Sequence, residues 1–234
     1  MEKQVSISMD DVHLTGDLVI PPHAESLIVF SHGSGSSRKS PRNRMVAKYL
    51  QDEGLGTFLF DLLTPEEDED VQTRFDIELL TNRLVGATQW LEAYSVAKSC
   101  RIGFFGASTG AASALRAAAL LPQIFAVVSR GGRPDLAGEL LKQVKAPTLL
   151  IVGAMDEGVL DLNREAYAKM TCEKKLVVVE GASHLFEEKG KMEEVAMLSA
   201  AWFIHHEMNA DDNDENFSTS HSRRKNASGK VNFL

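Results

Sequence analysis

Short apolar runs alternate with helical segments over most of this chain, and this alternation constrains the fold more than any other feature. The runs are apolar throughout rather than at every second position, which is typical of strands buried on both faces of a parallel sheet. Such a sheet needs helices on both of its faces. The predicted strands of this kind cover residues 26–33, 55–62, 101–105, 125–131, 147–153 and 174–181.

The first twenty residues have a different pattern, typical of a β-hairpin. The segments QVSISM and VHLTGDLVI flank Asp10 and Asp11, which predicts an antiparallel pair at one edge of the sheet. We therefore expect an α/β fold of about eight mostly parallel strands, with a single short helix and no lid domain between the strands at 125–131 and 147–153. The predicted helices cover residues 42–54, 73–94, 110–121, 135–143, 161–170 and 190–208.

Length and composition determine the domain organisation that we expect. The 234 residues suffice for one large α/β domain or two small ones, with a well-buried core. From about Asn209 the sequence has few apolar residues and joins an acidic block to a basic one. We predict a single domain over residues 1–208 and a disordered polar tail over 209–234. Acids and bases balance in the tail, so the net charge of −8 belongs to the folded part.

The net charge and the cysteine content limit the binding partners and the cellular compartment that we expect for the protein. A net charge of −8 argues against general nucleic-acid binding, which normally needs a basic face. The two cysteines, Cys100 and Cys172, argue against a disulfide framework. The start MEKQVSISMDD has no apolar segment of the secretory type, and no run of about 18 apolar residues follows. We expect a cytoplasmic protein without a membrane partner; a homodimer stays open.

Small residues surround one reactive side chain, Ser108, in the segment RIGFFGASTGAASALRAAALL at 101–121. The segment reads as a strand, a Gly-x-Ser-x-Gly pentapeptide and an alanine-rich helix. Gly106 and Gly110 allow the turn to close against adjacent strands. Ser108 is then exposed at the tip of the turn, where the helix N-terminus faces developing negative charge. The pattern predicts a nucleophile; the alternative is a strand-to-helix junction with a buried serine.

A serine hydroxyl is a weak nucleophile until a base takes its proton and a third group orients that base. Asp156 and His184 each follow a later predicted strand, which gives the chain order serine, acid, histidine. We expect these two side chains to meet Ser108 at the carboxyl edge of the sheet. Taken alone, Asp156 is equally suited to cap the next helix, and His184 to cap or pack the last one. If Asp156 is not the acid, Glu157 or Asp161 is its substitute.

Acyl transfer also needs N–H donors for the substrate carbonyl oxygen. The backbone N–H of Thr109, directly after the serine, is one expected donor. The segment SHGSGSS supplies the other, with Gly33 and Ser34 as the expected contributors. We expect His32 to hydrogen-bond this loop from within rather than to act as a second base, because His184 already fills that position.

Arginine residues follow several of the predicted strands on the side where the chemistry is expected. Arg130 and Arg133 lie in SRGGRPD, and Arg38 follows SHGSGSS. A guanidinium group binds carboxylate or phosphate through paired N–H donors, so these residues predict an anionic substrate. The alternative is that the arginines pair with acids such as those of TPEEDED, and we favour it for Arg42 and Arg44.

Four stretches together carry a family resemblance: FSHGSGSS, GFFGASTGAA, LLIVGAMDE and EGASHLFEE. Through them the chain resembles the α/β-hydrolase superfamily, and its dienelactone-hydrolase-like branch in particular, over residues 1 to about 208. The resemblance implies Ser108 as nucleophile, His184 as general base and then acid, and Asp156 as the orienting carboxylate. Dienelactone hydrolases proper use a cysteine nucleophile, whereas this chain has Ser108, and Cys100 lies before the strand and cannot replace it.

These features predict a serine hydrolase that forms an acyl-enzyme on Ser108 with a small ester, thioester or lactone. If the arginines bind the substrate, the substrate is anionic. An acyltransferase with the same residues and a non-catalytic binding module of this fold stay open. We expect no cofactor and no metal. The sequence has no His-x-x-x-His or Cys-x-x-Cys pair and no strand-linked Gly-x-Gly-x-x-Gly, and the consecutive acids at 66–70 lack the spacing of a cation site.

Overall fold

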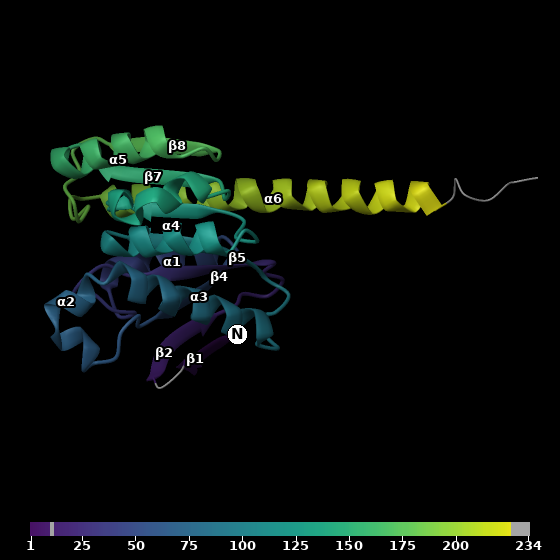
Figure 1. The fold of residues 1–234 in the computed structure, drawn as a ribbon, viewed down its shortest axis with the longest axis horizontal. Helices are drawn as coiled ribbons and strands as arrows, with labels where there is room; N and C mark the ends of the chain where they lie inside the picture. The colour runs from purple at the N-terminus through teal and green to yellow at the C-terminus, as the bar shows by residue number, and fades with distance from the viewer. Residues whose placement is uncertain (10–11, 226–234) are drawn as a thin grey trace, which may run out of the picture.

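One eight-stranded sheet forms the centre of the molecule, with strand order β1-β2-β4-β3-β5-β6-β7-β8 (Figure 1). The computed structural model describes the backbone of residues 1–9 and 12–225, and side chains as far as residue 208. The strands are β1 (Glu2–Met9), β2 (Val12–Val19), β3 (Ser26–Ser31), β4 (Gly56–Phe60), β5 (Arg101–Ala107), β6 (Val127–Arg130), β7 (Thr148–Gly153) and β8 (Lys174–Val179).

Strand pairing follows the sequence prediction. β1 pairs with β2, and β2 with β4, in antiparallel register, whereas every other neighbouring pair is parallel. The N-terminal hairpin therefore lies at one edge of a mostly parallel sheet.

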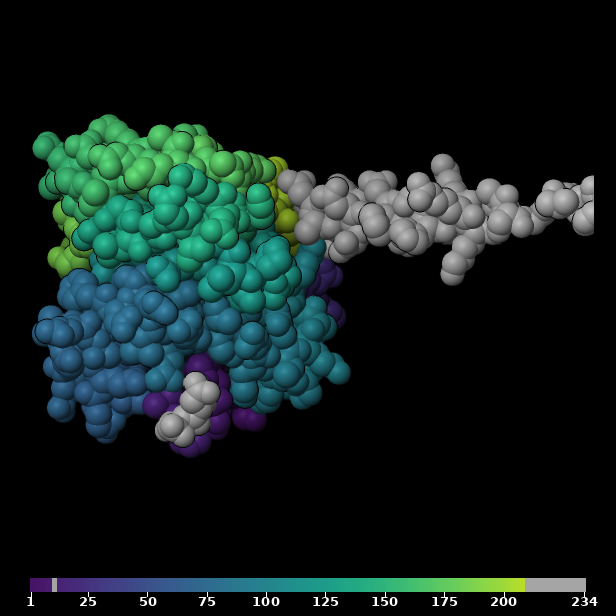
Figure 2. All heavy atoms as spheres, in the orientation of Figure 1, coloured from purple at the N-terminus to yellow at the C-terminus, as the bar shows by residue number. Residues whose placement is uncertain are grey.

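Helices cover both faces of the sheet. One face carries α3 (Ile77–Ala93), α4 (Thr109–Leu120), the 3₁₀ segment η2 (Pro134–Gln143) and α5 (Glu157–Lys169), which lie side by side. Figure 2 shows this face, on which the colours run from the blue of α3 through the teal of α4 to the green of α5. The other face carries α1 (Pro41–Asp52) and α6 (Lys191–Lys225), which pack together.

Each face has its own apolar core, and the strands alternate between the two. On β5, Ile102 and Phe104 contribute to the core under α3 and α4, whereas Phe105 and Ala107 contribute to the core under α1 and α6. This alternation is the period of two that a strand imposes on its side chains. Because both faces are buried, the strand reads as a continuous apolar run. Burial of each phenylalanine stabilises the fold by about 1.5–3 kcal/mol.

Two predicted helices differ in form from the structure. The segment predicted as a helix over 135–143 is 3₁₀ and is broken at Gly138, whose φ of 60° is outside the helical region. α3 begins at Ile77 rather than at residue 73, because the Asp76 side chain caps it by accepting the N–H of Leu79. The preceding residues form separate short turns, η1 (Glu67–Glu69) and α2 (Val71–Arg74).

The last helix extends past the predicted boundary near residue 208. α6 continues to Lys225, so helical backbone occupies part of the segment predicted as a disordered tail. In the sequence of this segment the acids precede the bases, which is the order that a helix dipole favours. Residues 226–234 lie outside the described residues, and the disorder of the tail stays a prediction. In the part of the chain that the structure describes, no helix combines the length and the apolarity needed to span a bilayer.

The connections after β3 and β5 run to opposite faces of the sheet. β3 leads to α1 on one face, and β5 leads to α4 on the other. Since β3 and β5 are neighbours, this divergence opens a crevice at their carboxyl ends, which is where open α/β sheets bind ligands. The loop after β3 contains SHGSGSS, and the turn after β5 contains Ser108.

Candidate active site

Ser108 lies at the turn between β5 and α4 with a strained backbone. Its φ of 52° and ψ of −122° belong to a region that residues with a Cβ rarely adopt. Such a conformation costs on the order of 1–3 kcal/mol and persists only where the surroundings enforce it. The Ser108 N–H donates to the Arg130 carbonyl at 3.2 Å, and the Ser108 carbonyl accepts the Arg133 N–H at 3.0 Å. The turn is therefore held by β6 and its following loop.

The two glycines of the pentapeptide are required by close backbone approach. A Cβ at Gly106 would lie 2.5 Å from the Ala111 Cα, and a Cβ at Gly110 would lie 2.1 Å from the Ser31 carbonyl oxygen. Both distances are far below van der Waals contact with backbone atoms. The small residues predicted to allow a tight turn thus have this role in the structure.

His184 and Asp156 come together although 28 positions separate them in the chain. The Nδ1 atom of His184 is 2.6 Å from Oδ2 of Asp156. Asp156 occupies the N-cap position of α5 but makes no capping hydrogen bond with its side chain. The carboxylate therefore faces the imidazole rather than the helix, and the Nδ1–H donates to it. This leaves Nε2 of His184 as the nitrogen that can accept a proton.

Ser108 and His184 line one cavity of about 140 Å³. Gly33 and Ser34 from the loop after β3 also line it, as does Arg130 from the end of β6. The His184 loop packs on Gly131, where a Cβ would lie 3.0 Å from the His184 carbonyl oxygen. A larger cavity of about 650 Å³ beside β1, β2 and α1 contains neither Ser108 nor His184. We place the candidate site by its chemistry, in the smaller cavity.

The predicted carbonyl-binding donors lie beside Ser108, but one of them is already used. Gly33 is close enough that a Cβ on it would lie 3.0 Å from the Ser108 Cβ. Thr109 is the first residue of α4, so its N–H is one of the helix donors without an intrahelical acceptor. The Ser34 N–H instead donates to the buried Thr109 hydroxyl at 2.8 Å. The Ser34 N–H is thus engaged in this conformation, and its role as an oxyanion donor stays a prediction.

His32 braces the loop after β3 from within. Its Nε2 accepts the Leu62 N–H at 3.1 Å, which places the ring proton on Nδ1, 3.0 Å from the Gly33 carbonyl oxygen. Burial lowers the pKa of His32 and keeps the ring neutral. The loop-bracing role expected of His32 is therefore the one that the hydrogen bonds show.

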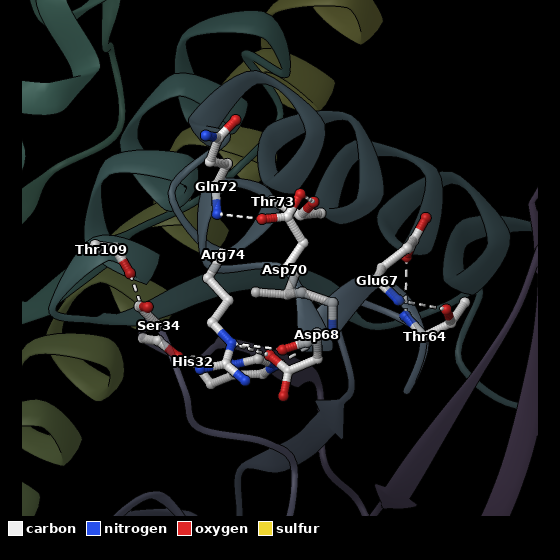
Figure 3. Close-up of polar contacts among 12 residues, drawn as sticks. His32, Ser34, Thr64, Glu67, Asp68, Asp70, Gln72, Thr73, Arg74 and Thr109 are labelled. Carbon is white, nitrogen blue, oxygen red and sulfur yellow. Dashed lines mark hydrogen bonds and ion pairs between the residues drawn. The ribbon is translucent and has the colours of Figure 1, made fainter.

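The acidic segment at 64–70 folds beside this loop (Figure 3). Arg74 reaches across it and donates from Nε to the Asp68 carbonyl and side chain, at 2.6 and 3.1 Å. Arg83 pairs with Glu67 at 2.8 Å. Two carboxylates of this segment, those of Glu67 and Asp68, thus have arginine partners from α3 and α2, which are not the arginines that the sequence suggested.

Two of the three arginines predicted to bind substrate are held by acids elsewhere. Arg133 forms a bidentate pair with Asp135, at 2.9 and 2.8 Å, and this hydrogen bonding raises its pKa. Arg38 lies 3.6 Å from both Asp17 and Asp61. Neither arginine lines the cavity that contains Ser108. Local acids already pair with both arginines, so their assignment as substrate-binding residues stays a prediction that this geometry does not support.

Arg130 is different, because it lines the cavity and has no acidic partner among the described residues. It is 4% exposed, and its NH2 group donates to the Asn43 Oδ1 at a long 3.4 Å. Burial, and next the charge of Arg42, lower its pKa to about 10. It remains charged at neutral pH.

Sequence reasoning missed part of the cavity wall. Arg42 and Asn43, in the first turn of α1, line the cavity together with Ser40. Arg42 also pairs with Glu187 at 3.1 Å, as expected of an arginine on a solvated helix face. The sequence does contain a signal for this part of the wall. Ser40-Pro41 is typical of the start of a helix, and it places the N-terminus of α1 directly after the loop that follows β3.

Comparison with known proteins identifies the class and then the family. The fold and the serine turn are those of an α/β hydrolase. The chain matches the model of the dienelactone hydrolase family over residues 18–213, and it belongs to this family. The crystal structure of a dienelactone hydrolase from Anabaena variabilis ATCC 29413 is 54% identical, with a TM-score of 0.85, and the match covers 88% of this chain and 97% of that one.

More distant and longer proteins complete the comparison. Est1E from Butyrivibrio proteoclasticus is 16% identical with a TM-score of 0.73, and the match covers 87% of this chain and 98% of that one, which supports the fold alone. Two Mycobacterium tuberculosis proteins named "putative phosphoribosyl transferase" are each 52% identical over 206 residues, which is 88% of this chain and 46% of theirs. The chain thus spans about half the length of these curated relatives.

Proposed function

We propose that the protein is a serine hydrolase that cleaves a small ester, thioester or lactone through an acyl-enzyme on Ser108. The observation that carries the proposal is the 2.6 Å contact between His184 Nδ1 and Asp156 Oδ2, with His184 and Ser108 on the wall of one cavity. Membership of a hydrolase family supports it. The strained backbone of Ser108 supports it as well, because strain of this kind is concentrated at functional sites.

The proposed reaction has two balanced halves. In the first, the Ser108 Oγ forms a bond to the substrate carbonyl carbon while its proton passes to His184 Nε2, and that proton then leaves on the departing alcohol or thiol. In the second, a water molecule gives its proton to the same nitrogen and attacks the acyl carbon. The proton returns to Ser108 and the acid is released. Asp156 holds the ring and stabilises its cationic form.

The negative charge that develops on the carbonyl oxygen needs donors in place before the reaction begins. The Thr109 N–H at the start of α4 is one proposed donor, and the Gly33 backbone beside Ser108 is the other. Loss of one such donor typically costs on the order of 10²–10³ in kcat. Hydrogen bonds with His32 and Thr109 hold the loop around Gly33, which favours donors that are in place before the substrate arrives.

A transferase of the same chemistry is the second candidate function. An acyl-enzyme on Ser108 that reacted with an alcohol or amine instead of water would give an acyltransferase. The transferase name of the two Mycobacterium tuberculosis relatives belongs to proteins more than twice as long as the matched segment. The mechanism proposed for Ser108 is the same in both cases, and only the acceptor differs.

A panel of esters, thioesters and lactones tests the proposal. Turnover by the wild type that falls by about 10³-fold or more in Ser108→Ala is the expected result. Ser113→Ala is the matched control, because this serine on α4 bonds to Ser31 and lies outside the cavity. Added alcohols and amines separate the two candidates: a hydrolase gives mainly the free acid, and an acyltransferase gives mainly the acylated acceptor.

A further inference from the structure

The cavity of Ser108 contains a buried positive charge that the hydrolytic steps do not use. Arg130 is almost inaccessible, yet its Nε has no hydrogen-bond partner in the part of the chain that the structure describes. Its neighbours are the Asn43 amide oxygen and the ring of Phe186, whose centroid lies 5.9 Å from the guanidinium carbon. A buried charge without a counter-charge is costly, and proteins seldom keep one without a reason. Among the described residues no acid compensates this charge, which leaves the position open to a bound anion.

A second feature of the cavity also favours an anion. α1 is 12 residues long, and its N-terminus opens on the cavity through Ser40, Arg42 and Asn43. The N-terminus of a helix carries a partial positive charge. In α1, Pro41 has no N–H and the Asn43 N–H donates to the Ser40 hydroxyl at 3.4 Å, which leaves the Arg42 N–H as the donor of the first turn that faces a ligand. Ser34 and Ser36 add polar groups to the same wall. No carboxylate is among the described residues that line the cavity.

The charge and the number of donors distinguish between classes of anion. A carboxylate carries one charge on two oxygens, and a single guanidinium fork donates one N–H to each of them. This wall offers Arg130, part of the charge of Arg42, the α1 terminus and three serines. A phosphate monoester carries a charge of about −1.5 to −2 at pH 7 on three strongly accepting oxygens. The larger charge and the larger number of acceptors match the wall better.

We propose that Arg130, Arg42 and the N-terminus of α1 form a subsite for the phosphoryl group of a phosphate monoester that is part of the acyl substrate. This inference rests on the proposed function of Ser108. Because the shared cavity measures only about 140 Å³, the phosphoryl group lies within a few bonds of the scissile carbonyl. The substrate class is a small acyl compound with a phosphoryl group on its acyl or leaving portion.

Binding of inorganic phosphate to the full chain tests the subsite directly. Ser108→Ala is the background for titration calorimetry at constant ionic strength, with phosphate and acetate as probes. We expect phosphate to bind at least about 10-fold more tightly than acetate. Adding Arg130→Gln should weaken phosphate binding by about 10- to 100-fold. Arg83→Gln is the matched control, since Arg83 is also a buried arginine but pairs with Glu67 outside the cavity, and it should leave the affinity within about twofold.

Thermal unfolding distinguishes a ligand-binding arginine from a structural one. Removal of an unpaired buried charge should leave the Tm of Arg130→Gln equal to or above that of the wild type, and phosphate should raise the Tm of the wild type only. A fall in Tm as large as that of Arg83→Gln would show that Arg130 braces the fold, which overturns the proposal. If Arg130→Gln does not fold, that result also overturns it. Arg42→Gln removes the second arginine of the subsite and should also weaken phosphate binding; unchanged phosphate affinity in Arg42→Gln would overturn the assignment of Arg42 to the subsite.

Three binding results also overturn the subsite: equal affinity for acetate and phosphate, unchanged phosphate affinity in Arg130→Gln, or no phosphate binding. These outcomes are independent of Ser108 chemistry, because the titrations use Ser108→Ala. Phosphate binding without turnover of any ester would contradict the proposed function alone. Turnover of neutral esters without phosphate binding would contradict the subsite alone.

Discussion

Replacing Asp156 with asparagine removes one charge from the contact on which the proposed mechanism depends. In the wild type the carboxylate accepts the Nδ1–H of His184 at 2.6 Å, and it is only 17% exposed. When His184 takes the proton of Ser108, it becomes a cation next to this anion. Two unit charges about 4 Å apart attract by about 4 kcal/mol at an effective dielectric constant of about 20. At 1.36 kcal/mol per factor of ten, Asp156→Asn should lower kcat by about 10³-fold.

A second effect of the substitution enlarges the loss. The asparagine amide can turn its NH₂ group toward the ring, which favours the tautomer with its proton on Nε2, where the ring cannot accept the serine proton. The combined loss should then approach about 10⁴-fold. The assay is turnover of a p-nitrophenyl ester, together with the Tm as a test of folding. Glu157→Gln and Asp161→Asn are the controls, because both acids are exposed on α5 and Asp161 pairs with Arg164.

The result that would refute the reasoning is a loss below about tenfold in Asp156→Asn with an unchanged Tm. A large loss in Glu157→Gln or Asp161→Asn instead would assign the acid to that residue. Equal losses in all three variants would show that the charge of this region acts from a distance rather than through the contact.

Three further predictions follow from the loop after β3 and the serine turn. Burial lowers the pKa of His32 from its usual 6.5, so as the pH falls the unfolded chain takes up this proton before the folded chain does. The free energy of unfolding should therefore decrease below pH 6.5, by up to about 1.36 kcal/mol per pH unit. Urea unfolding of wild type and His32→Asn tests this, and equal pH slopes for the two proteins would contradict it. Thr109→Val removes the acceptor of the Ser34 N–H and should lower kcat/KM about tenfold, whereas Thr109→Ser should retain it; equal effects on kcat/KM would exclude the hydroxyl. Gly110→Ala forces a Cβ to within 2.1 Å of a backbone oxygen and should destabilise the protein by about 1–3 kcal/mol or more in denaturant unfolding, unlike Gly158→Ala, where nothing lies within 4 Å.

The order and type of the elements could be predicted because they depend on local patterns. Buried parallel strands leave continuous apolar runs, as at β5, and the helices between them leave a period near four. The side chains that follow strand ends are then placed by topology, which is why Asp156 and His184 could be expected to meet. A 3₁₀ break at Gly138 follows from the backbone of one residue and leaves no periodic signal.

Which polar side chains pair with one another could not be predicted from such local patterns. Arg133 lies two residues from Asp135 and forms a fork with it, whereas Arg130 is the last residue of β6 and has no acidic partner among the described residues. The aspartate of SRGGRPD is a local partner for Arg133, but nothing in this stretch shows what surrounds Arg130, because α1 and the His184 loop, both distant in sequence, form its surroundings. The Ser34 N–H is a similar case, since its acceptor is 75 positions away. Competition between partners distant in sequence is decided only by the packed structure.

Covalent labelling with a fluorophosphonate tests the central claim most directly. The reagent phosphonylates a serine that an adjacent base activates, and intact-mass and peptide mass spectrometry locate the adduct. We predict one adduct on Ser108 in the wild type, no adduct in Ser108→Ala, and labelling slowed by about 10³-fold in Asp156→Asn. Labelling of Ser108→Ala at the wild-type rate, or no labelling of a folded wild-type protein, would contradict the account.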